Sequence, residues 1–62
     1  MKKYMVMINN YQKGKYLPLY AEYAISIEKV DRYHCKIVFL VDDFYKTRIE
    51  KCFNRKLQAI ED

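Results

Sequence analysis

The clearest structural signal in this sequence is the stretch YHCKIVFLVDD, residues 33–43. Its odd-numbered residues from Tyr33 to Val41 are all apolar or aromatic. Successive side chains of a strand point to opposite faces of a sheet, so this period of two predicts a strand over residues 33–41. The second face of that strand would carry His34, Lys36, Val38 and Leu40.

A helix is predicted to follow this strand directly. Asp42 is a favourable N-cap residue, and the negative charge of Asp42 and Asp43 suits the positive end of a helix dipole. From Phe44 to Ile60 the apolar residues recur at helical spacing, within an arc of about 160°. These residues are Tyr45, Ile49, Cys52, Phe53, Leu57, Ala59 and Ile60. A separate side of the same helix would carry the basic residues Arg48, Lys51 and Arg55, beside Phe44.

The residues before this stretch predict two further strands. Residues 3–9 alternate as a strand does, whereas residues 9–16 are polar, contain the only glycine and are typical of a loop. The alternation resumes over residues 19–29 and indicates a strand with Pro18 at its edge. The alternative for this segment is a helix that begins at Pro18 and carries a stripe of Leu19, Tyr23, Ile27 and Val30.

Together these elements predict an α+β fold in one small domain, residues 1–62. We expect a small three-stranded antiparallel sheet in the order β-β-β-α, with one C-terminal amphipathic helix packed on one face. One helix covers one face of a sheet, so the second face would stay open. We expect that face to draw on Met5, Met7, Tyr20, Ala24, His34, Lys36, Val38 and Leu40. This set is apolar enough to predict that a second copy of the chain or another macromolecule covers it.

Composition limits the classes of function. The 62 residues include 12 Lys and Arg against 8 Asp and Glu, for a net charge of +4. The first 20 residues hold four lysines and no acid, which is compatible with nucleic acid or with an acidic protein partner. The apolar run after Lys3 is too short for a signal peptide, and no stretch approaches the length of a membrane span. We therefore expect a cytoplasmic protein, with Cys35 and Cys52 reduced and used for packing.

The residues that carry catalysis or bind metals are few. His34 and Cys35 are neighbours in a predicted strand, so their side chains point to opposite faces and cannot hold one metal ion. Cys35 and Cys52 map to apolar positions, which raise the pKa of a thiol. A single glycine excludes a glycine-rich phosphate loop. We expect no enzyme activity, no metal and no cofactor.

Binding is the class of function that remains. Seven tyrosines are an unusually large share of this chain, and tyrosine is enriched in protein interfaces. We predict a non-catalytic protein-binding module, acting as a small phage-type inhibitor or modulator of a larger host protein. The phage origin is suggested by the small size and by the many residues with A/T-rich codons. The predicted contact residues are Tyr11, Tyr16, Tyr20, His34, Lys36, Val38, Leu40, Phe44, Arg48, Lys51 and Arg55.

Two other partners are compatible with the same residues. Lysines with exposed aromatic residues can bind single-stranded DNA or RNA, so a small basic nucleic-acid-binding module is the alternative. A homodimer is a further expectation, because a chain of this size has a thin core that a second copy would enlarge. We expect its contact at the open sheet face or at the strand edge near Pro18.

Overall fold

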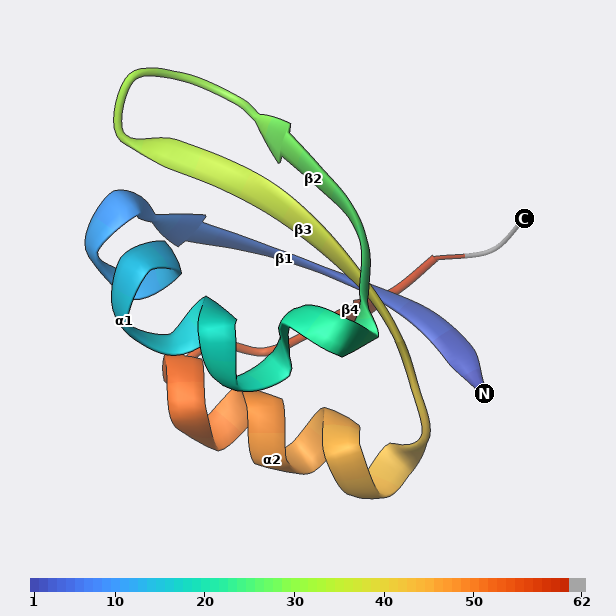
Figure 1. Ribbon diagram of the computed structural model, residues 1–62. Helices are drawn as coiled ribbons and strands as arrows, with labels where there is room; N and C mark the ends of the chain where they lie inside the picture. The colour runs from blue at the N-terminus through green and yellow to red at the C-terminus, as the bar shows by residue number, and fades with distance from the viewer. Residues whose placement is uncertain (61–62) are drawn as a thin grey trace.

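The computed structural model describes residues 1–60 and contains two helices and four strands (Figure 1). A short 3-10 turn, η1, links the first helix to the second strand. The elements are β1 (Lys2–Asn9), α1 (Asn10–Tyr20), η1 (Ala21–Tyr23), β2 (Ala24–Lys29), β3 (His34–Val41), α2 (Asp43–Phe53) and β4 (Gln58–Ala59). The chain is thus a small α+β protein, as its residue pattern predicts.

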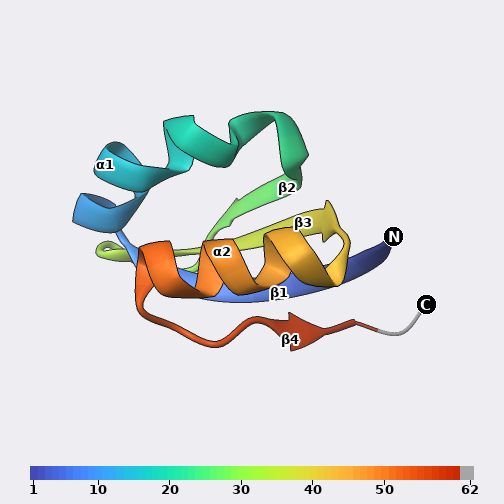
Figure 2. The ribbon, with the colours of Figure 1, turned by 90° about the horizontal axis from the view of Figure 1, so that it is seen from below.

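The four strands form one antiparallel sheet in the order β2-β3-β1-β4. β1 and β2 both pair antiparallel with β3, so they run parallel to each other with β3 between them. β3 and β4 are related in the same way through β1. The element order β-α-β-β-α-β with these interleaved strands is the ferredoxin-like, or split β-α-β, arrangement. Both helices lie on the same face of the sheet (Figures 1 and 2).

The hydrophobic core lies between this face and the two helices. The largest side chains without solvent exposure come from β1, β3 and α2, and their packing joins the sheet to the helical layer. Phe53 of α2 lies against Phe39 of β3 at 6.2 Å and against Tyr16 of α1 at 5.8 Å between ring centroids. The buried residues are Tyr4, Val6, Ile8, Leu17, Cys35, Ile37, Phe39, Val41, Ile49, Phe53 and Leu57.

Three of the predicted elements are confirmed. The strand predicted over residues 3–9 is β1, and the strand predicted over residues 33–41 is β3 without its first residue. Burial alternates along β3 in the predicted sense, from Cys35 to Val41. Asp42 is the N-cap of α2, and its side chain accepts a hydrogen bond from the Tyr45 N–H at 3.0 Å. In these segments the local pattern and the tertiary fold agree.

The predicted loop at residues 9–16 is wrong, because α1 begins at Asn10. The Asn9 Oδ1 accepts the Gln12 N–H at 2.8 Å, and the Gln12 Oε1 accepts the Asn9 N–H at 3.2 Å. This reciprocal capping box satisfies two backbone donors that a helix start leaves unpaired. Only Leu17 of α1 is buried, so the helix lacks the apolar stripe that sequence patterns reveal. The strand predicted over residues 19–29 is also shorter than expected. It begins only at Ala24, because the end of α1 and η1 occupy the residues before it.

The predicted end of the second helix is also wrong. α2 stops at Phe53, where Asn54 takes a left-handed conformation with φ 55°. The Glu50 carbonyl accepts the N–H groups of Asn54 and Arg55, and the Glu50 Oε2 accepts the Leu57 N–H at 2.8 Å. These bonds turn the chain back along the sheet, where β4 pairs with Tyr4 and Met5. The sheet therefore has four strands and not three.

Candidate binding surfaces

The face of the sheet opposite the helices is a continuous surface across β1 and β3. Met5 is the cross-strand partner of Val38, and Lys3 is that of Leu40. Neighbours of this kind contact each other directly on one face of a sheet. Met7 is 44% exposed, and the other apolar members are partly exposed. We call this surface the open sheet face; it comprises Met5, Met7, His34, Lys36, Val38 and Leu40.

Lys36 and His34 of the open sheet face have partners on β2 and on the turn that follows it. Lys36 Nζ lies 3.3 Å from Glu28 Oε2, and His34 Nδ1 lies 3.1 Å from Asp31 Oδ1. The Asp31 carboxylate also accepts the backbone N–H groups of Tyr33 and His34, both at 2.8 Å. The bond from Tyr33, with those from His34, holds the pKa of Asp31 below its usual value. An apolar centre is therefore bordered by polar residues that have partners within the fold.

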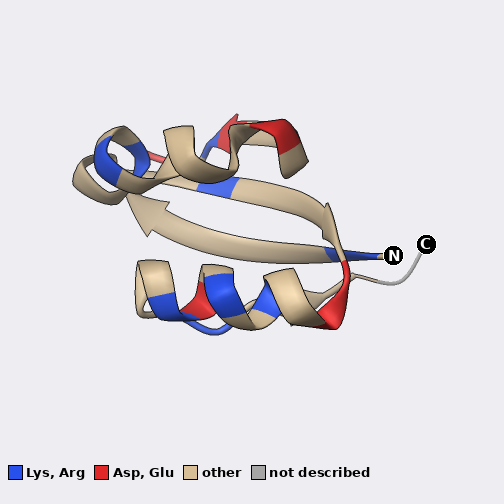
Figure 3. Cartoon of the chain, turned by 60° about the horizontal axis from the view of Figure 1, so that its bottom comes forward, with Lys and Arg blue, Asp and Glu red and all other residues tan. Residues whose placement is uncertain are grey.

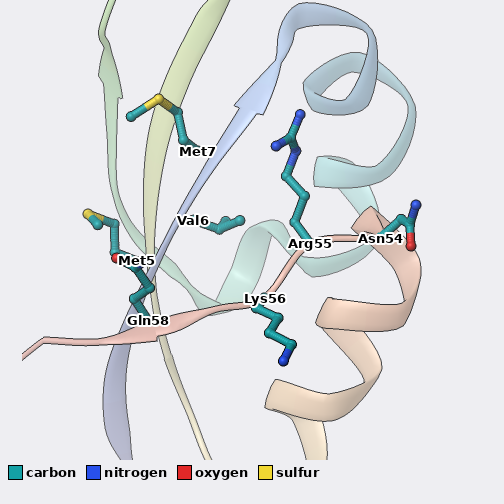
Figure 4. Close-up of a pocket in the computed structure, with 7 residues that line it drawn as sticks. All are labelled: Met5, Val6, Met7, Asn54, Arg55, Lys56 and Gln58. Atoms are coloured by element: carbon teal, nitrogen blue, oxygen red, sulfur yellow. The ribbon is translucent and has the colours of Figure 1, made fainter.

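The outer edge of β1 borders a pocket of about 400 Å³. β4 pairs only with Tyr4 and Met5, so the strand continues past its short partner. The pocket is lined by β1 on one side and by residues 54–58 on the other. Figure 4 shows Met5 and Met7 on one side of β1 and Val6 on the other, with Arg55 across the pocket. The edge of the open sheet face is thus hollowed and basic.

The three tyrosines predicted as contact residues, Tyr11, Tyr16 and Tyr20, differ in their exposure to solvent. All three lie on α1, not on a loop or a strand. Tyr11 is 67% exposed, so it is available for a contact. Tyr16 and Tyr20 are partly buried and pack against the core, and the Tyr16 ring is nearly perpendicular to that of Phe53. Tyr20 and Ala24 were expected on the open sheet face, and both are instead packed on the helical side.

The predicted basic ridge of Arg48, Lys51 and Arg55 is not a single helix face. α2 ends before Arg55, whose Nε lies 3.4 Å from Gln12 Oε1 of α1. Arg48 remains on α2, with its guanidinium 5.5 Å from the ring centroid of Phe44, which is 62% exposed. The acidic residues Asp43 and Glu50 also lie among the basic residues of this helix (Figure 3). The positive charge of α2 is therefore divided and partly balanced.

A second basic surface was not predicted as one site. Lys13 lies on α1, Lys29 ends β2, and Arg32 lies in the turn before β3. The three residues line one pocket of about 300 Å³ with Asn10, Ile27 and Cys35. Tyr11 and Tyr33 are 67% and 63% exposed. Tyr11 lies on α1, and Tyr33 lies in the turn before β3. Lys13 lies far in sequence from Lys29 and Arg32, so the sequence pattern identifies each cation but not the cluster.

Comparison with models of protein families, with curated proteins and with solved structures found no match to this chain.

Within residues 1–60, no three His, Cys, Asp or Glu side chains gather into a group that could hold a metal ion. Cys35 is buried, and burial raises the pKa of the Cys52 thiol above its ordinary value. A raised pKa leaves less of the nucleophilic thiolate at neutral pH. In the same range, no helix has the length and hydrophobicity needed to cross a membrane.

Tyr23 offers a test of the contact between η1 and α2. Its ring lies 4.9 Å from that of Tyr45 between centroids. The hydrogen bond with Tyr45, together with partial burial, raises the pKa of Tyr23 to about 12. The fold thus favours the neutral phenol, so this contribution to stability is complete below the unfolded pKa of about 10 and is lost as pH rises through about 12.

We expect a late step near pH 12 from Tyr23 in an ultraviolet titration of the tyrosines. Burial, with the hydrogen bond to Asp43, also raises the pKa of Tyr4, so this tyrosine titrates late as well. Tyr23→Phe should therefore lower the amplitude of the late step by one tyrosine. Tyr33→Phe changes an exposed phenol in the same way and should leave that amplitude unchanged. A late step of unchanged amplitude in Tyr23→Phe would show that the contact between the two rings is wrong.

Proposed function

We propose that this chain is a non-catalytic protein-binding module that contacts its partner through the open sheet face. The observation that carries this proposal is the placement of both helices on one side of the sheet. Met5, Met7, Val38 and Leu40 are left on the other side, where no element among residues 1–60 packs over them. Apolar patches of this kind on small proteins mark interaction sites.

The arrangement of this face matches the usual anatomy of an interface. Protein interfaces have an apolar centre and a polar rim, and methionine is enriched in them. Here Met5 and Val38 form the centre, and the pair of Lys36 with Glu28 lies on the rim. A standard interface takes about 800 Å² from each partner, under a fifth of the 4521 Å² exposed by this chain. One face of the molecule is enough for specific binding.

We propose that the chain acts by covering a surface of its partner protein. A chain of 62 residues that covers a functional surface of a larger protein inhibits or redirects that protein without chemistry of its own. We place this action in the cytoplasm, where Cys35 and Cys52 would stay reduced. The phage-type modulator expected from the sequence belongs to this class.

Leu40→Lys is the variant that tests the proposal. Leu40 is partly exposed on the open sheet face, so a lysine there should leave the fold intact and place a charge in the interface. Leu19→Lys is the matched control, because Leu19 is 65% exposed on α1, on the other side of the sheet. Affinity purification from the lysate of a low-GC bacterium, with quantitative mass spectrometry, compares the three proteins. We expect a partner captured by the wild type and by Leu19→Lys, and a loss of at least tenfold with Leu40→Lys.

The competing occupant of this face is a second copy of the chain. Light scattering at tens of micromolar distinguishes the two cases. A monomer leaves the face free for another protein, as we propose. A stable dimer that Leu40→Lys dissociates and Leu19→Lys does not would overturn the proposal and establish the predicted homodimer. Equal capture by all three proteins would place any partner on a different surface.

A further inference from the structure

The end of the molecule where α1 begins carries a cluster that the open sheet face does not include. We call it the basic end; it comprises Tyr11, Lys13, Lys29, Arg32 and Tyr33. Two of its residues come from the first turns of α1, one from the end of β2 and two from the turn before β3. Figure 3 shows basic residues on the first part of α1.

Hydrogen bonds hold these segments in a fixed relation. The Asn10 N–H donates to the Tyr33 carbonyl at 3.0 Å, and the Asn10 Nδ2 donates to the Arg32 carbonyl at 3.0 Å. The turn itself is closed by the Val30 N–H, which donates to the His34 carbonyl at 3.1 Å. The backbone positions of the cluster are therefore set before any ligand arrives, which lowers the entropy cost of binding.

The pocket between these segments concentrates positive charge. Lys13, Lys29 and Arg32 line it, and none of its lining residues is acidic. Within residues 1–60 these three cations form no ion pair. The nearby carboxylates are engaged elsewhere: Asp31 with backbone N–H groups and His34, and Glu28 with Lys36. Three uncompensated cations around one pocket are suited to an anion.

The aromatic residues indicate which anion. Tyr11 and Tyr33 are 67% and 63% exposed, and exposed rings beside cations provide stacking platforms for unpaired bases. Lys15 Nζ lies 5.5 Å from the ring centroid of Tyr11 and keeps a further positive charge at this end. An acidic peptide would use the cations but would not need two exposed rings. Lysine contacts phosphate as a point charge and carries little base specificity.

We propose that the basic end is a binding site for single-stranded nucleic acid, independent of the open sheet face. Lys13, Lys29 and Arg32 contact backbone phosphates at the pocket, and Tyr33 and Tyr11 stack on neighbouring bases. Since the contacts are to phosphates and to the faces of bases, binding is largely independent of sequence.

Fluorescence anisotropy with labelled thymidine and uridine oligonucleotides of about 15 nucleotides tests this site. Three phosphate contacts on a single strand release about two counterions, so affinity should fall by about 20-fold between about 50 and 200 mM salt. Lys29→Gln removes one contact, and the same fall should shrink to about sevenfold. Lys51→Gln on α2 removes the same charge away from the pocket and should leave the salt dependence unchanged. Equal effects of the two variants would overturn the proposal.

Variants of Tyr33 test the stacking contact separately. Tyr33→Ala should weaken binding by about tenfold, and Tyr33→Phe, which keeps the ring, should bind as the wild type does. An oligoglutamate peptide and inorganic phosphate serve as competing probes. If oligoglutamate binds as tightly as the oligonucleotides, or if the pocket binds phosphate while no oligonucleotide binds at low salt, the nucleic-acid assignment is wrong. Circular dichroism verifies that each variant is folded.

Discussion

Phe53→Ala should destabilise the fold by about 3–5 kcal/mol and leave the chain largely unfolded at 25 °C. Phe53 has no solvent exposure and contacts rings from the other helix and from the sheet, Tyr16 of α1 and Phe39 of β3. Its removal leaves a cavity at the point where the two helices and the sheet meet. A single core in a domain this small rarely supplies more than about 3–5 kcal/mol in total, so the loss equals most of the stability.

Phe44→Ala is the matched control for this prediction. Phe44 lies in the first turn of the same helix but is 62% exposed, and its contacts are with Tyr45 and Arg48 at the surface. We expect a cost below about 1 kcal/mol. Urea unfolding followed by circular dichroism compares the two variants with the wild type. Similar midpoints for both would show that the core is not centred on Phe53.

Gln12→Ala should have the second largest effect, a loss of about 2 kcal/mol, because this polar side chain links three segments. Its Oε1 accepts the Asn9 N–H at 3.2 Å, and its Nε2 donates to the Phe53 carbonyl at 2.7 Å. The Arg55 Nε donates to the same Oε1 at 3.4 Å. Alanine would remove half of the α1 capping box and leave the carbonyl at the end of α2 without this donor.

Two further variants make this prediction specific. Gln58→Ala removes an exposed glutamine side chain from β4 and should change stability by less than about 0.5 kcal/mol. Gln12→Glu keeps an acceptor for the Asn9 N–H, as a capping box requires, but cannot donate to the Phe53 carbonyl while ionised. Its loss should fall between those of the two alanine variants. If Gln12→Ala unfolds at the same urea concentration as Gln58→Ala, the link between the helices contributes nothing.

The open sheet face shows what alternation alone can predict about a site. Met5, Met7, Val38 and Leu40 were expected on one face because they occupy alternate positions in two strands, and β1 and β3 pair Met5 directly with Val38. Tyr20 was assigned to the same face on the assumption that its segment was a strand. It lies on α1 and packs against the core instead. The residues on one face of a sheet are therefore predicted correctly only where their secondary structure is predicted correctly.

The basic end shows the opposite case. Lys13 lies far in sequence from Lys29 and Arg32, so no helical or strand period relates it to the other two cations. The three cations line one pocket because Asn10 binds the carbonyls of Arg32 and Tyr33, a contact between α1 and the turn before β3. Likewise Arg55 leaves the predicted ridge because Asn54 ends the helix and the chain turns toward β1. Sites built from several segments require the tertiary structure.

The sequence by itself determined the central strands and the start of α2, because alternation and an Asp cap act between residues that are neighbours in the chain. Only the tertiary structure decided where α1 lies, where α2 ends and that β4 exists. α1 has a single buried residue and is held by Gln12 on the Phe53 carbonyl, and β4 exists only where β1 offers it an edge. Such contacts join residues more than 40 positions apart. Their stabilising energy therefore cannot be inferred from any short stretch of the sequence.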